Sequence, residues 1–226
     1  ISEAYRKARA ADPIAAFGGV VSILGTVDGE TAKIVSEAFI EGIVAQDFTE
    51  EAREILSKKT SMRLLKLPGE WKIQDAVDMK KITGGMLIQD RDDVELNRAE
   101  TKVVTKREPT QDEWKALEFA WVVSQFVKSN AIVFAHADVT VATGAGQMSR
   151  VDSVKIAKLK AQSSLAGTAV GSDAFFPFRD GVDEIASAGA TAIIQPGGSV
   201  RDQEVIDAAN EHNIAMVFTG IRHFRH

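Results

Sequence analysis

The sequence contains no cysteine. This absence excludes disulfides, thiol nucleophiles and every zinc site with a cysteine ligand, including the zinc site of nucleobase deaminases. It is typical of proteins that work in a reducing compartment. Because no secretory or transit leader is recognisable at Ile1 either, a cytoplasmic protein is expected, and no metal-ligating side chains are predicted.

Long apolar runs and blocks of basic residues are also missing. No segment approaches the roughly 18 consecutive apolar residues of a membrane helix, and the mean hydropathy is −0.06. The net charge is −5, and no block of lysine and arginine is longer than two or three residues, so neither a membrane nor a nucleic acid is an expected partner. The composition is that of an ordinary globular protein, and 226 residues are enough for one large domain or two small ones.

Helical periods alternate with short apolar runs along most of the chain. Residues 68–107 differ, because β-branched runs there indicate strands and loops without a long helix. Thr110 and Glu113 have the spacing of a capping box at the start of a helix. This order predicts an α/β fold with two units, 1–107 and 108–226. Helices are predicted over 2–11, 28–38, 49–58, 148–164, 180–188 and 202–212, and strands over 19–24, 42–45, 62–67, 168–170, 192–195 and 215–218.

The stretch VATGAGQMSRVDS at 141–153 places two glycines between a strand and a helix. Ser149 and Arg150 fall in the first helical turn, where free N–H groups and a guanidinium suit an anion. The stretch lacks the lysine of a nucleotide-binding P-loop and the full dinucleotide spacing. Two interpretations therefore remain, an anion site and a strand-to-helix turn capped by Ser149.

Three further stretches contain residues that could form a functional site. IIQPGGSVRDQEVID at 193–207 has the Ser-x-x-Asp spacing of a helix cap and a second glycine turn. SDAFFPFRD at 172–180 gathers three phenylalanines, which suit either a flat heteroaromatic ligand or the core. The C-terminal GIRHFRH follows an apolar strand, so it either frays or lies at a ligand-binding sheet edge. His136, alone at a strand end, is a weaker candidate.

Several long blocks together resemble one family, the formyltransferase part of AICAR transformylase/IMP cyclohydrolase. They are AYRKARAADPIAAFGG, ILSKK, SNAIVFAHADVTVATGAGQMSRVDS, SDAFFPFRDGVDE and IIQPGGSVRDQEVIDAANEHNIAMVFTGIRHFRH. The resemblance runs from residue 2 to His226. It implies formyl transfer from 10-formyltetrahydrofolate to the 5-amino group of AICAR in purine biosynthesis. It also implies tandem, zinc-free cytidine-deaminase-like α/β domains and a homodimer with active sites at its interface.

The resemblance also implies roles for individual residues. Asn130 is implied as the catalytic residue, orienting AICAR or stabilising the oxyanion. AICAR is expected to contact Gly18, Glu41, Asn130, Arg150, Arg222, Phe224 and His226. The reduced folate is expected to contact Phe17, Val151, Phe175, Pro177, Phe178, Asp180, Gly181 and Ser199. A structural monovalent cation near the SNA stretch is part of the same expectation.

The chain departs from the family pattern in three respects. The family's Lys-His pair, which includes the presumed base, precedes the AYRKARAADP block and therefore lies upstream of Ile1. The Arg-Tyr stretch and the cyclohydrolase domain are expected upstream as well, so the fragment alone is predicted to be nearly inactive. Thr60 stands where a lysine is expected. Two other functions remain open, a folate- or nucleotide-binding module and a dimerisation scaffold without catalysis.

Overall fold

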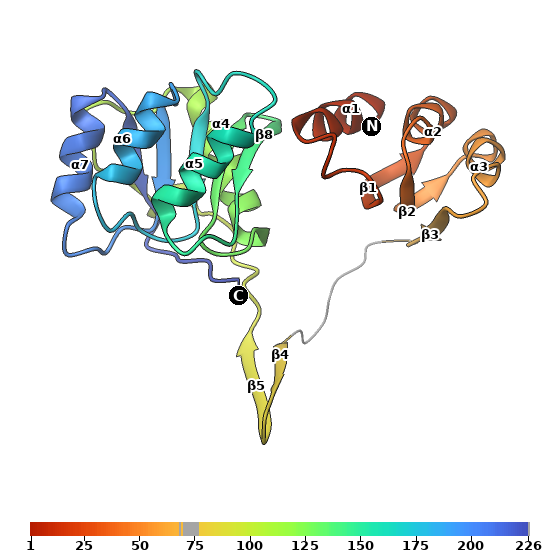
Figure 1. The fold of residues 1–226 in the computed structure, drawn as a ribbon, viewed down its shortest axis with the longest axis horizontal. Coiled ribbons are helices and arrows are strands. Elements are labelled where there is room, and N and C mark those ends of the chain that lie inside the picture. Colours follow the sequence, from red (N-terminus) through yellow and green to blue (C-terminus); the bar gives the residue numbers. More distant parts are fainter. Residues whose placement is uncertain (68, 70–76, 226) are drawn as a thin grey trace. The chain divides into compact units, whose positions relative to one another are not determined.

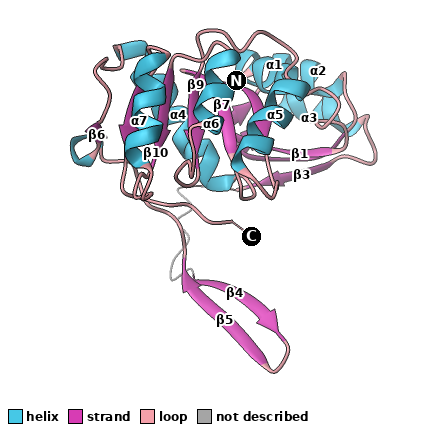
Figure 2. Ribbon diagram, turned by 60° about the vertical axis from the view of Figure 1, so that its left-hand side comes forward, coloured by secondary structure: helices cyan, strands magenta, loops and turns pink. Residues whose placement is uncertain are grey.

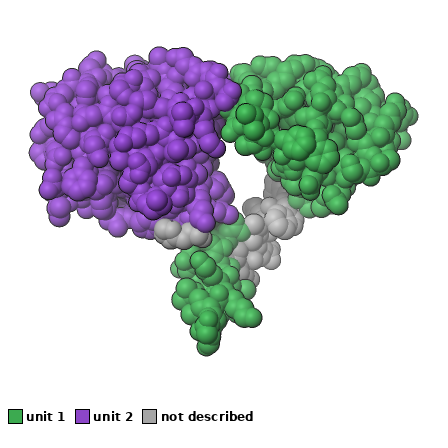
Figure 3. All heavy atoms as spheres, viewed as in Figure 1, with its two compact units in different colours: residues 1–93 green, residues 94–226 purple. Residues whose placement is uncertain are grey.

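The computed structural model describes residues 1–67, 69 and 77–225 (Figure 1). The chain forms two compact units, Ile1–Asp93 and Val94–His226, shown in green and purple in Figure 3. The second unit begins before the expected 107/108 boundary, because strand β6 (Lys102–Val103) pairs with the last strand of that unit. Among the described residues, no helix combines the length and the apolar character that crossing a membrane requires.

The first unit contains a parallel three-stranded sheet in the order β1-β2-β3. Short polar side chains cap its second and third helices, since Asp28 accepts the Thr31 N–H at 2.8 Å and Thr49 accepts the Ala52 N–H at 3.2 Å. The apolar faces of the helices and strands form one core around Val27, Val35, Ile43 and Leu56. Its elements are α1 (Ser2–Ala11), β1 (Gly19–Val27), α2 (Gly29–Ser36), β2 (Ile40–Phe48), α3 (Glu50–Ser57) and β3 (Arg63–Lys66).

A separate hairpin follows in the chain, formed by β4 (Val77–Ile82) and β5 (Gly85–Asp90). The turn that joins the strands has Gly84 at φ +82°, a conformation that favours glycine. Between this hairpin and helix α4 (Gln111–Phe126) lie β6 and a single 3₁₀ turn at Arg98–Glu100. The strands and loops predicted after residue 68 are thus confirmed over the described part of that segment.

The second unit is built on a six-stranded sheet in the order β6-β11-β10-β9-β7-β8 (Figure 2). Helix α4 packs on one face, where Trp114, Leu117 and Trp121 meet alternate residues of β10 and β11. Helices α5, α6 and α7 pack on the other face and enclose a second core. The elements are α4 (Gln111–Phe126), β7 (Ile132–His136), β8 (Val139–Gly144), α5 (Arg150–Lys160), β9 (Ala169–Ser172), α6 (Asp180–Ser187), β10 (Ala192–Gln195), α7 (Asp202–Glu211) and β11 (Ala215–Phe218).

The two units share one order of elements. In the first, β1-α2-β2-α3-β3 places three parallel strands side by side, and β9-α6-β10-α7-β11 does the same in the second. A helix precedes each set, α1 and α5 respectively. The second unit also contains α4 and the antiparallel pair β7-β8. The α/β class predicted from the sequence is confirmed, and the repeated order is visible in topology although the sequence shows no repeat.

Arg107 joins three segments of the second unit. Its Nη1 and Nη2 donate to the Glu113 carboxylate of α4 at 2.8 and 2.9 Å, and its Nε donates to the Asn213 carbonyl at 2.9 Å. Its Nη2 also donates to the Thr191 carbonyl. Glu113 also closes the capping box with Thr110 that the sequence predicts. Burial raises the pKa of Glu113, but hydrogen bonds from Arg107 and Thr110 outweigh it and hold the pKa at about 2.

The lowered pKa of Glu113 predicts a pH-dependent loss of stability. A carboxyl whose pKa is depressed in the folded state stabilises above its unfolded pKa of 4.5 and loses this contribution as pH falls towards 2. Glu113→Gln should lower the free energy of unfolding at pH 7 by on the order of 2–3 kcal/mol and flatten its fall below pH 4.5. Urea unfolding over pH 2–7 measures both effects. Asp112→Asn, which removes a 90% exposed carboxylate, is the control, and equal pH profiles for the two variants would contradict the assignment.

Candidate functional site

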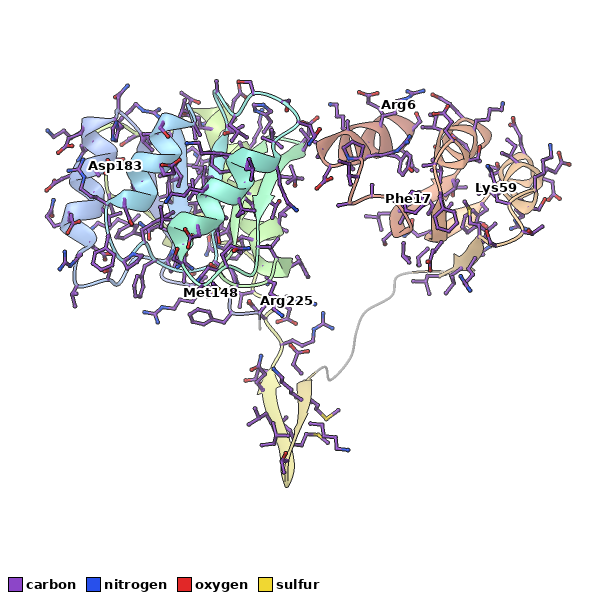
Figure 4. The ribbon with its side chains drawn as sticks, in the orientation of Figure 1. Arg6, Phe17, Lys59, Met148, Asp183 and Arg225 are labelled. Atoms are coloured by element: carbon purple, nitrogen blue, oxygen red, sulfur yellow. The ribbon has the colours of Figure 1, made fainter. Side chains whose placement is uncertain are left out.

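Most of the sequence-predicted residues of the second unit lie at one edge of its sheet. Strands β9, β10 and β11 are parallel, so the loops that follow them, 173–179, 196–201 and 219–225, leave the same edge. Open α/β sheets bind ligands at the carboxyl ends of their strands. The turn before α5 reaches the same place, as Met148 and Arg225 in Figure 4 show, whereas Asp183 lies away from it on α6. This edge is the candidate site of the second unit.

Arg150 is the first residue of α5, and Ser149 caps that helix by accepting the Asp152 N–H at 3.1 Å. The helix ends at Lys160, earlier than predicted, because Ala161 leaves the helical conformation. The Arg150 side chain is only 7% exposed. Its Nε donates to Ser172 Oγ at 2.8 Å and its Nη2 to Asp173 Oδ1 at 2.6 Å. The residue is therefore a fixed, buried cation whose charge is already matched by a carboxylate.

Asn130 precedes β7 and is held by the turn before α5. Its side-chain Nδ2 donates to the carbonyls of Gln147 at 2.9 Å and Met148 at 3.2 Å. The backbone carbonyl of Asn130 accepts a hydrogen bond from the Ser153 hydroxyl at 2.8 Å. The two bonds from Nδ2 fix the plane of the side-chain amide, and Oδ1 is the acceptor atom of that amide.

The C-terminal tail is anchored rather than frayed. Ser129 and Arg225 exchange two hydrogen bonds of 2.9 and 3.1 Å, and the His223 N–H donates to the Asp173 carbonyl at 2.8 Å. The His223 ring is buried edge-on against Trp121, with centroids 4.4 Å apart. Phe224 and Arg222 remain exposed. His226 lies outside the described residues.

The aromatic loop divides its rings between the core and the surface. Phe176 is fully buried, and its N–H donates to Gln195 Oε1 at 3.0 Å. Gly181 is required beside it, because a Cβ there would lie 2.5 Å from the Phe176 ring. Phe175 is half-buried and Phe178 is exposed. Each ring lies under a guanidinium, with Arg222 5.0 Å from the Phe175 ring and Arg201 4.9 Å from the Phe178 ring. Pro177, between them, is half-buried.

The glycine turn before α7 uses its polar residues differently from the predicted cap. Asp202 accepts the N–H groups of Gly198 at 2.7 Å and Ser199 at 3.0 Å, and Ser199 Oγ accepts the Arg201 N–H at 3.1 Å. Helix α7 therefore begins after Arg201 without a serine cap. A Cβ on Gly198 would lie 3.8 Å from Arg222 Nη2, so this turn adjoins the tail.

The remaining candidates of the second unit lie at the starts of its helices or away from the edge. Val151 follows Arg150 in α5 and is half-buried. Asp180 begins α6, and its Oδ1 accepts the Gly181 N–H at 2.8 Å. His136 ends β7 as an exposed residue. Among the described residues, no three acidic or histidine side chains come together as metal ligands.

The candidates of the first unit form their own group. Gly18, at φ +73°, donates to the Phe39 carbonyl at 2.9 Å, and the Phe17 ring contacts the Phe39 ring at 5.1 Å between centroids. Glu41 is exposed near the start of β2, whose Ile40 pairs with Gly19. Phe17 is largely exposed (Figure 4). These residues lie at the amino ends of β1 and β2.

Sequence reasoning missed three residues that organise the edge. Ser172 and Asp173 hold Arg150, and Gln195 holds the aromatic loop. Asp173 is completely buried, and its Oδ2 has no hydrogen-bond partner among the described residues. A polar residue that ends or directly follows a fully buried strand was the available signal, because burial of such a group needs a partner.

The chain matches the AICARFT/IMPCHase bienzyme family over residues 1–160. It is 50% identical over 229 residues to "Bifunctional purine biosynthesis protein PurH" of Leptospira biflexa serovar Patoc, covering 100% of this chain and 45% of that protein. It is 52% identical over 233 residues to the protein of the same name from Anaeromyxobacter sp. strain Fw109-5, covering 100% of this chain and 44% of that protein. The chain thus spans slightly less than half the length of these relatives.

Because the Arg150–Asp173 pair is buried, removing the Asp173 carboxylate should destabilise the fold more than removing a surface carboxylate. Asp173→Ala should lower the free energy of unfolding by about 3–5 kcal/mol, because it leaves the buried guanidinium without its counter-charge. Asp183→Ala, which breaks ion pairs of a 38% exposed side chain, should cost less than about 1 kcal/mol. Urea unfolding at pH 7 compares them. Similar losses for both variants would show that the Arg150 pair does not stabilise the fold in this way.

Proposed function

Because the chain belongs to the AICARFT/IMPCHase bienzyme family, we propose that it serves formyl transfer from 10-formyltetrahydrofolate to the 5-amino group of AICAR. In this proposal the chain supplies most of the folate pocket and much of the nucleotide pocket. The observation that carries it is the convergence of the anchored tail, the Arg150 turn and the aromatic loop on one sheet edge.

The proposed folate site uses the two surface rings of the aromatic loop. Phe175 and Phe178 flank Pro177, each with a guanidinium over one side of its ring, and a second aromatic face suits the pterin ring. Asp180, at the start of α6, and Ser199, in the loop before α7, would supply hydrogen-bond partners for its polar edge. The burial of Phe176 supports this division, because it anchors the loop in the core while Phe178 is 48% exposed.

The proposed chemistry depends on orienting a weak nucleophile. The lone pair of the AICAR amine is delocalised into an imidazole that carries a carboxamide, so the amine needs orientation, a base and stabilisation of the oxyanion on the formyl carbon. Asn130 has committed its side-chain N–H groups to Gln147 and Met148. Its Oδ1 would therefore accept an N–H of AICAR and orient it, rather than donate to the oxyanion.

Arg150 is proposed as a fixed positive charge beside the nucleotide. Its pairing with Asp173 and Ser172 restrains the guanidinium, so binding costs little side-chain entropy. Arg222 and Phe224 of the tail are exposed at the same edge. The remaining proposed contacts rest on the family resemblance alone. AICAR would contact Gly18, Glu41 and His226, and the folate would contact Phe17.

The proposal also includes tandem deaminase-like domains, a monovalent cation and a homodimer. The support for tandem deaminase-like domains is the repeated order of strands and helices in the two units. The support for a monovalent cation is the buried Oδ2 of Asp173, an oxygen ligand without a hydrogen-bond partner among the described residues. The homodimer, the absence of zinc and the cytoplasmic location follow from the resemblance and composition, and remain predictions.

Folate binding tests the proposed site directly. Phe175→Ala should weaken binding of 10-formyltetrahydrofolate by roughly tenfold, because it removes an aromatic face worth about 1–2 kcal/mol. Leu159→Ala removes an 80% exposed side chain of α5 away from the edge and should leave affinity unchanged. Calorimetric titration gives both dissociation constants. If the two variants bind alike, the aromatic loop is not the folate site, and a scaffold without ligand becomes the better interpretation.

Catalysis by the isolated chain should be very slow. Without the base expected from the family's Lys-His pair, formyl transfer should be about 10²–10⁴-fold slower than in the full-length Leptospira biflexa relative. A spectrophotometric assay of tetrahydrofolate formation, with AICAR and 10-formyltetrahydrofolate at equal concentrations for both proteins, measures the ratio. Equal rates would mean that the base lies within these 226 residues.

A further inference from the structure

The β4-β5 hairpin exposes apolar side chains that a stable fold normally covers. Every residue of its two six-residue strands is exposed, and an isolated two-stranded hairpin is marginally stable at best in water. Six large apolar residues are among them, in a stretch that can be followed in yellow in Figure 1. They are Val77, Met79, Ile82, Met86, Leu87 and Ile88.

The register sorts these residues between the two faces of the hairpin. Residues paired across an antiparallel ladder share a face, and successive residues alternate. The pairs Val77–Asp90, Met79–Ile88 and Lys81–Met86 therefore form one face, on which four of the six residues are apolar and Met79–Ile88 is the central pair. The opposite face holds Asp78–Gln89, Lys80–Leu87 and Ile82–Gly85, which is mostly polar or small.

The two charges on the apolar face sit at opposite ends. Lys81 lies next to the turn, one pair before Ile82–Gly85, and Asp90 closes the open end opposite Val77. They are separated by the whole length of the face, so they do not pair within one hairpin. Two copies stacked face to face in antiparallel directions would bury the apolar centre and bring each Lys81 to the Asp90 of the other copy. The face is therefore complementary to itself, as a two-fold interface requires.

We propose that the β4-β5 hairpin is a dimerisation arm, whose Val77, Met79, Met86 and Ile88 face packs against the same face of a second copy of this chain. The inference deepens the proposed function, because it names a surface for the homodimer expected there. Cover by another part of the same chain is the competing arrangement, and it predicts a monomer.

Neighbouring residues of β5 provide a matched test. Ile88 and Leu87 are 63% and 56% exposed and point to opposite faces. Ile88→Asp should raise the dimer dissociation constant of the 226-residue chain at least tenfold, since it places a charge in a buried apolar contact. Leu87→Asp disturbs the hairpin equally but should change the constant by less than about threefold. Sedimentation velocity over a concentration series measures both.

A charge exchange tests the antiparallel stacking itself. Lys81→Asp and Asp90→Lys should each weaken the dimer by roughly two- to tenfold, and the double variant should regain most of the loss. Rescue is specific to a contact between copies, because the two residues face Met86 and Val77 within their own hairpin.

Three results would overturn the proposal: a monomeric wild-type chain, equal effects of Ile88→Asp and Leu87→Asp, or no rescue by the double charge exchange. The titration of wild type and Phe175→Ala with 10-formyltetrahydrofolate tests the folate site separately, so failure of the hairpin proposal and failure of the proposed function can be told apart. A dimer that survives Ile88→Asp unchanged would leave the expected homodimer in place and remove only the hairpin from its interface.

Discussion

The candidate site depends on one buried ion pair, Arg150 with Asp173. The arginine belongs to the first turn of α5 and the carboxylate to the loop after β9, so their contact fixes two loops at the same sheet edge. The backbone carbonyl of Asp173 then accepts the His223 N–H, which attaches the C-terminal tail to the same point. Charges this deeply buried are costly unless paired. The pair thus imposes one arrangement on three segments that are distant in the chain.

Local patterns predicted most of the secondary structure. The Thr110–Glu113 capping box and the parallel βα order are confirmed, because short-range hydrogen bonds and apolar periodicity determine them. The partner of Arg150 was not predictable in the same way, since it lies 23 residues away and the contact depends on how β9 aligns beside β7. The cap at Ser199 was misjudged for a related reason. Ser-x-x-Asp fits a capping box, but the glycine turn lets Asp202 take the preceding N–H groups instead.

The aromatic loop shows why composition alone left two interpretations open. Three phenylalanines in four residues suit a core or a ligand, and the chain uses the loop for both. Phe176 fills the space above Gly181 and holds the loop through Gln195, while Phe175 is half-buried and Phe178 is exposed. Which ring turns inward depends on the space left by neighbouring helices. That space is a tertiary property, and no spacing rule in the sequence encodes it.

The repeated βαβαβ order does not produce equivalent sites in the two units. In the second unit the candidate residues follow the carboxyl ends of β9, β10 and β11, where parallel strands direct their loops towards a ligand. In the first unit Phe17, Gly18 and Glu41 lie at the amino ends of β1 and β2. A shared scaffold therefore does not determine which of its edges is used, since loops carry function more freely than strands.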